Sequence, residues 1–164
     1  MDIFEAIKNN NLDKVKELLA KPDIDVNTEN KDGWTPLHRA CFFNKEIVKL
    51  LLAHPNIDVN VKNNYGNSPL FIACSSNNIE IVKLLLTYPK INVNVENNDR
   101  DTPLYLACLY DKIEIVKLLL THPDIKINFD ITEFKNEVEL YPYLKRKQNI
   151  NLDKVNKILD MIEG

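Results

Sequence analysis

Apolar residues recur along this chain at helical spacing, inside segments that are themselves repeated every 33 or 34 residues. Each segment opens with a short apolar stretch and continues with a six-residue block of the pattern Ile-Val-Lys-Leu-Leu-Leu. This combination of periods predicts a helix, a turn and a second helix in every copy. Three full copies are present, and they run from Thr35 to Asn60, from Ser68 to Asn94 and from Thr102 to Asn128.

Proline positions predict where these helices begin and end. A Ser or Thr before a Pro is typical of a helix N-cap followed by the first helical residue. This pair opens each copy, with the prolines at Pro36, Pro69 and Pro103. The first helices are expected to end near Asn44, Asn77 and Asp111, with the first copy one residue shorter after Asn44. The prolines expected to end the second helices are Pro55, Pro89 and Pro123.

Each second helix leads into an extended stretch and then a turn, such as the one at Asn63–Gly66, so that a hairpin projects from every unit. Shorter versions of the pattern flank the three copies. Ile3, Phe4 and Ala6 match first-helix positions at the N-terminus, and Tyr141–Leu144 match them at the C-terminus, with Leu152–Val155 as the second helix there. The predicted single domain therefore divides into a cap repeat at 1–30, repeats at 31–63, 64–97 and 98–131, and a cap repeat at 132–164.

The segment Thr35-Pro36-Leu37-His38-Arg39-Ala40 resembles the TPLHxA signature of the ankyrin repeat, and the likeness covers nearly the whole chain. The resemblance implies an all-α solenoid of stacked helix-turn-helix units with projecting hairpin loops. It also implies that hairpin tips and first helices form a concave strip that binds a partner protein. Transferred position by position, the expected protein-binding residues are Lys31, Asp32, Trp34, Phe42, Phe43, Asn64, Tyr65, Asn67, Ser75, Ser76, Asp99, Asp101, Leu109 and Tyr110.

Two features of this strip leave alternatives open. Its large side chains are expected to anchor a partner, but Phe42 and Phe43 could instead pack into the shortened turn of their own repeat, with Trp34 covering the next hairpin. In addition, Arg100 stands where the first two hairpins have Gly. Since Gly tolerates a positive φ, this residue implies either mild strain or a reshaped tip around Asp99 and Asp101.

Composition narrows the function further. The chain has 164 residues, a net charge of −3 and only 3 Gly, which argues against nucleic-acid binding and against glycine-rich phosphate loops. No apolar run approaches the length of a membrane span, and the charged N-terminus is unlike a signal peptide. Asn occurs 22 times, and we attribute this bias to genome composition. Cys41, Cys74 and Cys108 occupy equivalent repeat positions and are expected to be buried thiols in a reducing compartment.

Catalytic or metal-binding chemistry is not expected. His38 belongs to the signature, where its ring ties helix to hairpin, and His54 and His122 each precede a Pro at a helix end. None of the three is part of a nucleophile–base set, so we expect no enzyme activity and no cofactor. One modification is conceivable on resemblance alone. Asn27 and Asn60 each follow a Leu by eight residues in an Asp-Val-Asn context, which resembles targets of asparaginyl hydroxylation; the alternative is that they simply hydrogen-bond within the hairpin.

The sequence thus favours a non-catalytic protein-interaction module that acts as a scaffold, adaptor, inhibitor or effector. The alternative is a partner- or substrate-recruiting domain of a larger enzyme, channel or ubiquitin-ligase assembly, although the caps at both ends favour a self-contained protein. The expected partner is another protein, with no nucleic acid and no membrane involved. A monomer in the cytoplasm is expected, with nuclear location or delivery into a host cell left open.

Overall fold

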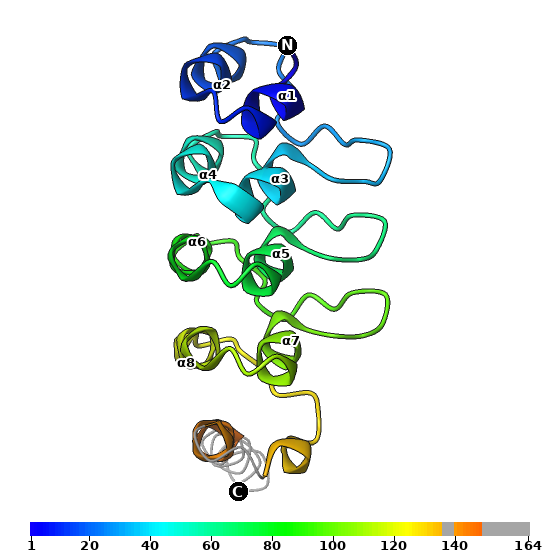
Figure 1. Cartoon of the computed structure of the whole chain (residues 1–164), viewed down its shortest axis with the longest axis vertical. Coiled ribbons are helices and arrows are strands. Elements are labelled where there is room, and N and C mark those ends of the chain that lie inside the picture. Colours follow the sequence, from blue (N-terminus) through cyan, green and yellow to red (C-terminus); the bar gives the residue numbers. More distant parts are fainter. Residues whose placement is uncertain (136–139, 149–164) are drawn as a thin grey trace, which may run out of the picture.

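The chain forms a single stack of paired helices, with loops that project from one side (Figure 1). The computed structural model describes residues 1–135 and 140–148, apart from the side chain of Phe43. Odd-numbered helices form one column and even-numbered helices form the other (Figure 1). Their bounds are α1 Ile3–Lys8, α2 Leu12–Leu19, α3 Pro36–Phe43, α4 Lys45–Leu52, α5 Pro69–Ser75, α6 Ile79–Leu86, α7 Pro103–Leu109, α8 Ile113–Thr121 and the 3-10 helix η1 Ile131–Phe134.

Polar side chains fix the start of nearly every α-helix. The predicted N-caps Thr35, Ser68 and Thr102 each accept a hydrogen bond from the backbone N–H three residues on, with Pro at the first helical position. The second helices begin in the same way, at Asn11, Asn44 and Asn78. These caps explain why each of these short helices begins at a fixed residue.

Lys112 replaces the capping Asn at the start of α8, and its side chain binds the end of another helix instead. Its Nζ donates to the carbonyl oxygens of Cys74 at 3.0 Å and Ser75 at 2.6 Å, at the end of α5 in the preceding unit. A cation at a helix C-terminus satisfies otherwise unpaired carbonyls and opposes the helix dipole. The helix α8 therefore lacks a side-chain N-cap, while α5 in the neighbouring unit gains a C-terminal cap.

The apolar seam between units is closed along its length. Leu37, Leu70 and Leu104 are fully buried at equivalent positions in the odd column, as are Ala40, Ala73 and Ala107. The three cysteines are free and buried at the equivalent sites of α3, α5 and α7. Burial raises the pKa of Cys74 and Cys108 to about 12, and that of Cys41 as well, so these thiols are protonated packing groups, as predicted.

The C-terminal unit differs from the prediction. Residues 141–148 form a helix, but it lies in the even column below α8, whereas η1 occupies the odd column below α7 (Figure 1). Lys117 of α8 lies 4.8 Å above the ring of Tyr143. The assignment of Tyr141–Leu144 to a first helix was therefore wrong, because η1 already covers α7 with Ile131 and Phe134. The predicted second helix at Leu152–Val155 lies outside the described residues.

Asparagine side chains link each unit to the next. The side chain of Asn60 donates to the carbonyl oxygen of Lys90 at 2.8 Å and accepts from the N–H of Asn92 at 2.8 Å. Asn27 and Asn94 make the same pair of bonds one unit earlier and one unit later. Each bond is worth about 1 kcal/mol net. We call this series of bonds the asparagine ladder, and it gives Asn a structural role that the sequence analysis had assigned to genome composition.

A second set of asparagines shapes the hairpins. Asn63 Oδ1 accepts from the N–H groups of Tyr65 and Asn67, and Asn30 and Asn97 repeat this arrangement. Successive tips are also bonded to one another. The N–H of Asn64 donates to the carbonyl of Asp32, and the N–H of Asn98 donates to that of Tyr65, both at 3.1 Å. The tips are therefore held in register along the stack.

Arg100 keeps the geometry of the glycines that it replaces. Its φ is 68°, against 73° for Gly33 and 77° for Gly66, so the tip is strained and not reshaped. A Cβ at Gly66 would lie 2.6 Å from the backbone nitrogen of Asn98 in the next hairpin. The third hairpin is followed by η1 in place of another tip, which explains why a side chain is accommodated there.

His38 ties its own helix to the following hairpin, as the resemblance implied. Its Nδ1 lies 3.1 Å from the backbone N of Thr35, and its Nε2 lies 2.9 Å from the carbonyl oxygen of Asn67. Burial lowers the pKa of the imidazole, because the charged form would lose its hydration. The ring is therefore a buried neutral link between two units.

The seam predicts the effect of enlarging a small residue. Ala73→Leu would overpack the contact of α5 with its neighbours and lower the free energy of unfolding by about 1–3 kcal/mol. Ala53→Leu, at an exposed position after α4, is the matched control and should change it little. Urea unfolding of both variants checks this, and equal stabilities would contradict the assigned register.

The stability of the two kinds of hairpin tip should respond differently to substitution. Gly66→Ala forces a Cβ against the next hairpin and should cost about 1–3 kcal/mol. Arg100→Gly relieves a positive φ at a tip that carries no further hairpin, and should be neutral or stabilise by up to about 1 kcal/mol. Thermal unfolding measures both. A destabilised Arg100→Gly variant would show that the side chain itself holds the tip.

The buried imidazole predicts a loss of stability in mild acid. Because the folded-state pKa of His38 is lowered, the unfolded chain binds the extra proton first, and stability falls as the pH drops below about 6.5. The slope for one group is at most about 1.4 kcal/mol per pH unit. In His38→Phe, which copies Phe71, the free energy of unfolding should be lower at pH 7 but should change less between pH 7 and 5. An unchanged pH slope would contradict this.

Candidate functional site

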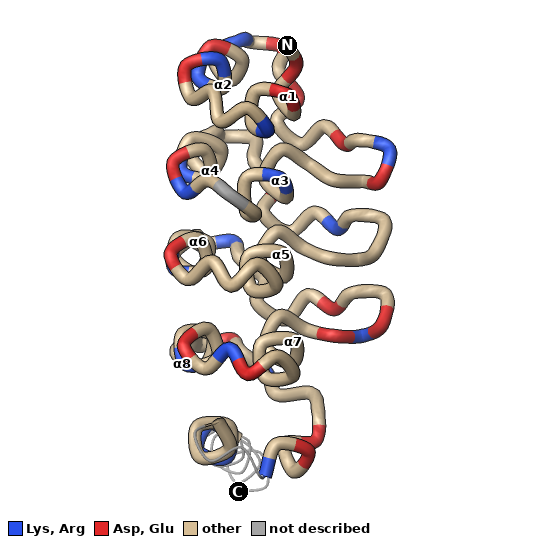
Figure 2. Tube along the Cα trace, viewed as in Figure 1, with Lys and Arg blue, Asp and Glu red and all other residues tan. Residues whose placement is uncertain are grey.

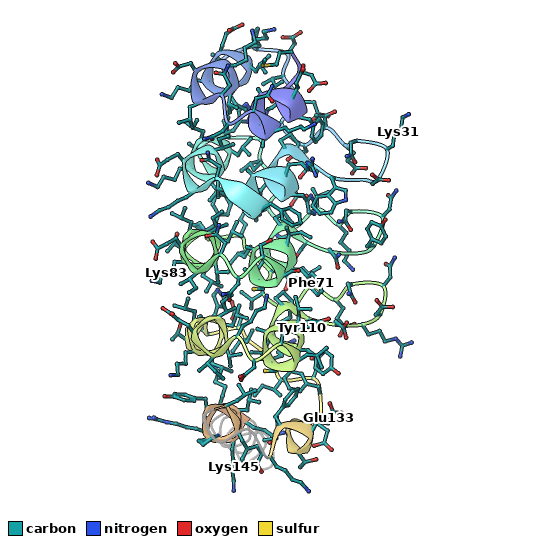
Figure 3. All side chains as sticks on the ribbon, viewed as in Figure 1. Lys31, Phe71, Lys83, Tyr110, Glu133 and Lys145 are labelled. Atoms are coloured by element: carbon teal, nitrogen blue, oxygen red, sulfur yellow. The ribbon has the colours of Figure 1, made fainter. Side chains whose placement is uncertain are left out.

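The predicted binding residues lie on one side of the stack, on the hairpin tips and at the ends of the odd-numbered helices (Figures 1 and 3). We call this surface the recognition strip. Eight of its predicted residues are exposed: Lys31, Asp32, Asn64, Tyr65, Ser75, Asp99, Leu109 and Tyr110. Five are half-buried: Trp34, Phe42, Asn67, Ser76 and Asp101. The side chain of Phe43 lies outside the described residues.

Large apolar side chains are unusually exposed on this strip. Tyr65 is 60% exposed, Leu109 51% and Tyr110 63%. Among the described residues, the only other exposed large apolar side chains are Met1 and Tyr143, and Tyr143 is less exposed than the three on the strip. Exposing Tyr and Leu to water forgoes the free energy of burial, so a row of them on one face is typical of a surface that another protein covers.

Trp34 and Phe42 form a packed pair inside a single unit. Their ring centroids lie 5.4 Å apart with 25° between the planes, and the Arg39 guanidinium lies 5.9 Å from the Trp34 ring. Trp34 also makes an edge contact with His38 at 5.8 Å. The structure therefore supports packing of Phe42 within its own repeat, and places Trp34 beside it on the same unit. The two rings are pre-arranged, and their half-buried faces remain on the strip.

Several polar strip residues are already engaged within the fold. The amide of Asn64 donates to the carbonyl of Lys31, and the hydroxyl of Ser76 donates to the carbonyl of Ile72. Asn67 accepts from His38 through its backbone carbonyl. These hydrogen bonds hold the strip in shape, whereas the side chains of Tyr65 and Tyr110 are exposed to solvent.

Charge is distributed unevenly along the strip. The first hairpin carries both signs, at Glu29, Lys31 and Asp32, whereas acidic residues gather around the third hairpin and the turn after it (Figure 2). The acidic set comprises Glu96, Asp99, Asp101, Asp130 and Glu133. Asp130 and Glu133 were missed from the sequence because a fourth hairpin was assumed where the chain forms η1.

The histidines outside the signature have hydrogen bonds to nearby backbone groups. No three His, Cys, Asp or Glu side chains among the described residues come together as a metal site. The Nδ1 atoms of His54 and His122 accept from the backbone N–H groups of Asn56 and Asp124, which stabilises the turns after α4 and α8. Within the described ranges, all helices are too short or too polar to cross a bilayer.

Asn27 and Asn60 belong to the asparagine ladder, where both the donor and the acceptor of each amide are bonded to the next unit. This differs from the predicted alternative of bonds within a hairpin. Hydroxylation of these two residues stays a prediction.

Comparisons with known proteins agree with this geometry. A family model described as ankyrin repeats (3 copies) matches residues 3–97 and 55–132. The SMC5-SMC6 complex localization factor protein 1 of Bos taurus and that of Homo sapiens are each 40% identical to this chain over 45 residues. Those matches cover 27% of this chain and 4% of each relative. Because the first family match alone spans more than half of the sequence, and the stacked helix pairs agree with it, this chain belongs to the ankyrin-repeat family.

Proposed function

We propose that this chain is a non-catalytic interaction module that binds a partner protein along the recognition strip. Ankyrin repeats are generally protein–protein interaction modules. The observation that carries the proposal is the exposed row of Tyr65, Leu109 and Tyr110 on a surface otherwise held rigid by the hairpin bonds. Rigid aromatic side chains make good anchors, since little conformational entropy is lost when they are covered.

The roles of scaffold, adaptor, inhibitor or effector all require such a surface and no chemistry. We propose a monomer in the cytoplasm, and the buried, protonated thiols support a reducing compartment for it. The partner is proposed to be a protein, because the net charge of −3 and the acidic third hairpin disfavour nucleic acid and anionic membranes.

A second candidate is a recruiting domain within a larger enzyme, channel or ubiquitin-ligase assembly. The chain covers only 4% of the length of the curated relatives that it matches, which are named as localization factors of a complex. In those relatives the matched region is a small part of a much longer chain. The recognition strip would then bind a substrate or partner for chemistry located elsewhere.

The strip is tested by affinity capture from the native host with matched tyrosine variants. Tyr65→Ala and Tyr110→Ala should each reduce the captured partner by about tenfold or more, as expected for an interface anchor. Tyr143→Ala is the control, since this tyrosine is 43% exposed on the helix below α8 and away from the strip. A partner lost equally with Tyr143→Ala, or retained by both strip variants, would contradict the proposal.

A further inference from the structure

A hollow of about 230 Å³ opens beside the third hairpin, where the hairpin series stops. It is lined by residues from the hairpin, from α7, from the segment that leads into η1 and from η1 itself: Arg100, Asp101, Tyr105, Asn128, Phe129, Asp130 and Glu133. The hollow therefore exists because η1 takes the place of a fourth hairpin.

Aromatic rings form one wall of this hollow. The Tyr105 and Phe129 centroids lie 5.2 Å apart at 61°, and Phe134 meets these rings at 6.3 Å and 5.8 Å. Phe134 is buried and belongs to η1, whereas Tyr105 and Phe129 are half-buried and line the opening. Edge-to-face contacts of this kind hold the rings in place and leave part of their surface to a ligand.

The remaining lining is acidic and lacks an ion-pair partner. None of Asp101, Asp130 and Glu133 forms a salt bridge with a described residue. The salt bridges among the described residues lie within even-numbered helices or between two of them. Glu133 extends into solvent on the hairpin side, below Tyr110 (Figure 3). With Arg100 counted, these four lining residues carry a net charge of −2, and Glu96 and Asp99 add negative charge nearby.

Burial, together with this excess of negative charge, raises the pKa values of two groups. Partial burial, and then the charge of Asp99, raise the pKa of the Asp101 carboxyl. The pKa of the Tyr105 hydroxyl is raised by burial and by the charges of Glu133 and Asp101. Carboxylates from two separate elements thus act on the same aromatic wall, and a cation placed there would relieve both.

The shape of the site selects among cations. A metal ion is not favoured, because no three acidic, His or Cys side chains among the described residues come close enough to ligate one. A guanidinium is planar, stacks on aromatic faces and donates to carboxylates in pairs, whereas an ammonium is a compact and strongly hydrated point charge. A lining that combines aromatic rings with three carboxylates matches the planar cation.

We propose that this hollow receives an arginine side chain from a basic segment of the partner protein. The guanidinium stacks on one of the two rings that line the opening, Tyr105 or Phe129, and donates to the carboxylates of the lining, which are those of Asp101, Asp130 and Glu133. This inference rests on the proposed function, and it adds the chemistry of the partner: a chain segment with an exposed arginine that follows the strip toward its C-terminal end.

The test uses defined peptides, so that no natural partner is needed. The full-length chain, labelled with ¹⁵N, is titrated with an octapeptide of alternating Gly and Arg, with its Gly-Lys counterpart, and with a Gly-citrulline peptide that is planar but uncharged. Saturable amide shifts are expected at Asp101, Tyr105, Phe129 and Thr132 with the arginine peptide. Binding of the lysine peptide should be weaker by about fivefold or more, and the citrulline peptide should not bind.

Matched variants identify the site. Glu133→Gln should weaken arginine-peptide binding by about fivefold, while Glu114→Gln, which removes the same charge from an exposed position of α8 outside the strip, should change it by less than about twofold. Tyr105→Leu should abolish the preference for arginine over lysine. Shifts spread over other surfaces, equal effects of Glu133→Gln and Glu114→Gln, equal binding of the two cationic peptides, or no saturable binding would each overturn the proposal.

These outcomes are separable from failure of the proposed function. Loss of captured partner in Tyr110→Ala, combined with no peptide binding at the hollow, removes only the arginine site. Arginine binding at the hollow, combined with capture that ignores Tyr65 and Tyr110, removes the strip as the anchor and leaves the hollow as an isolated site.

Discussion

The hydrogen bonds that pass from one unit to the next are the constraint on which the remaining structure depends. A pair of helices of six to nine residues cannot bury its own apolar face, so each unit is stable only against its neighbours. Apolar contact alone would allow units to slide or tilt. The asparagine ladder removes that freedom, because each amide must meet both a carbonyl and an N–H of the following unit. His38 and Lys112 add further bonds across the same boundaries.

This coupling also builds the surface that binds. The tips lie in register because the N–H of each donates to the tip before it, which fixes the position of Tyr65 on the second tip. Tyr110 belongs to the strip through the end of α7. The same rule explains the exception at the end of the series. Where no further tip follows, Arg100 is accommodated at a positive φ, and an aromatic and acidic hollow opens that a fourth hairpin would have filled. The hollow beside the third hairpin is thus a consequence of where the series of hairpins stops.

The sequence predicted most of the helices because their signals are local and repeated. Thr35-Pro36 and its copies mark helix starts, and the cysteines mark the buried seam. Both signals can be recognised because they depend only on residues within one or two helical turns. The C-terminal helix was assigned to the wrong column because Tyr141-Pro142 can begin any helix, and only contact with α8 shows which one. The roles of asparagine and of Lys112 were missed for a related reason. The partners of Lys112 and of the ladder asparagines lie 29 to 38 residues away, and nothing local to these side chains reveals such bonds.

The coupling between units is tested most directly by amide hydrogen exchange at Asp58, Asn92 and Lys126. These residues lie outside the helices and are exposed, but each N–H donates to the ladder asparagine of the preceding unit. The account predicts exchange at least about 100-fold slower than for an unstructured chain, and loss of that protection at Asn92 in Asn60→Ala. Exchange of all three amides at the unstructured rate in the native protein would contradict it.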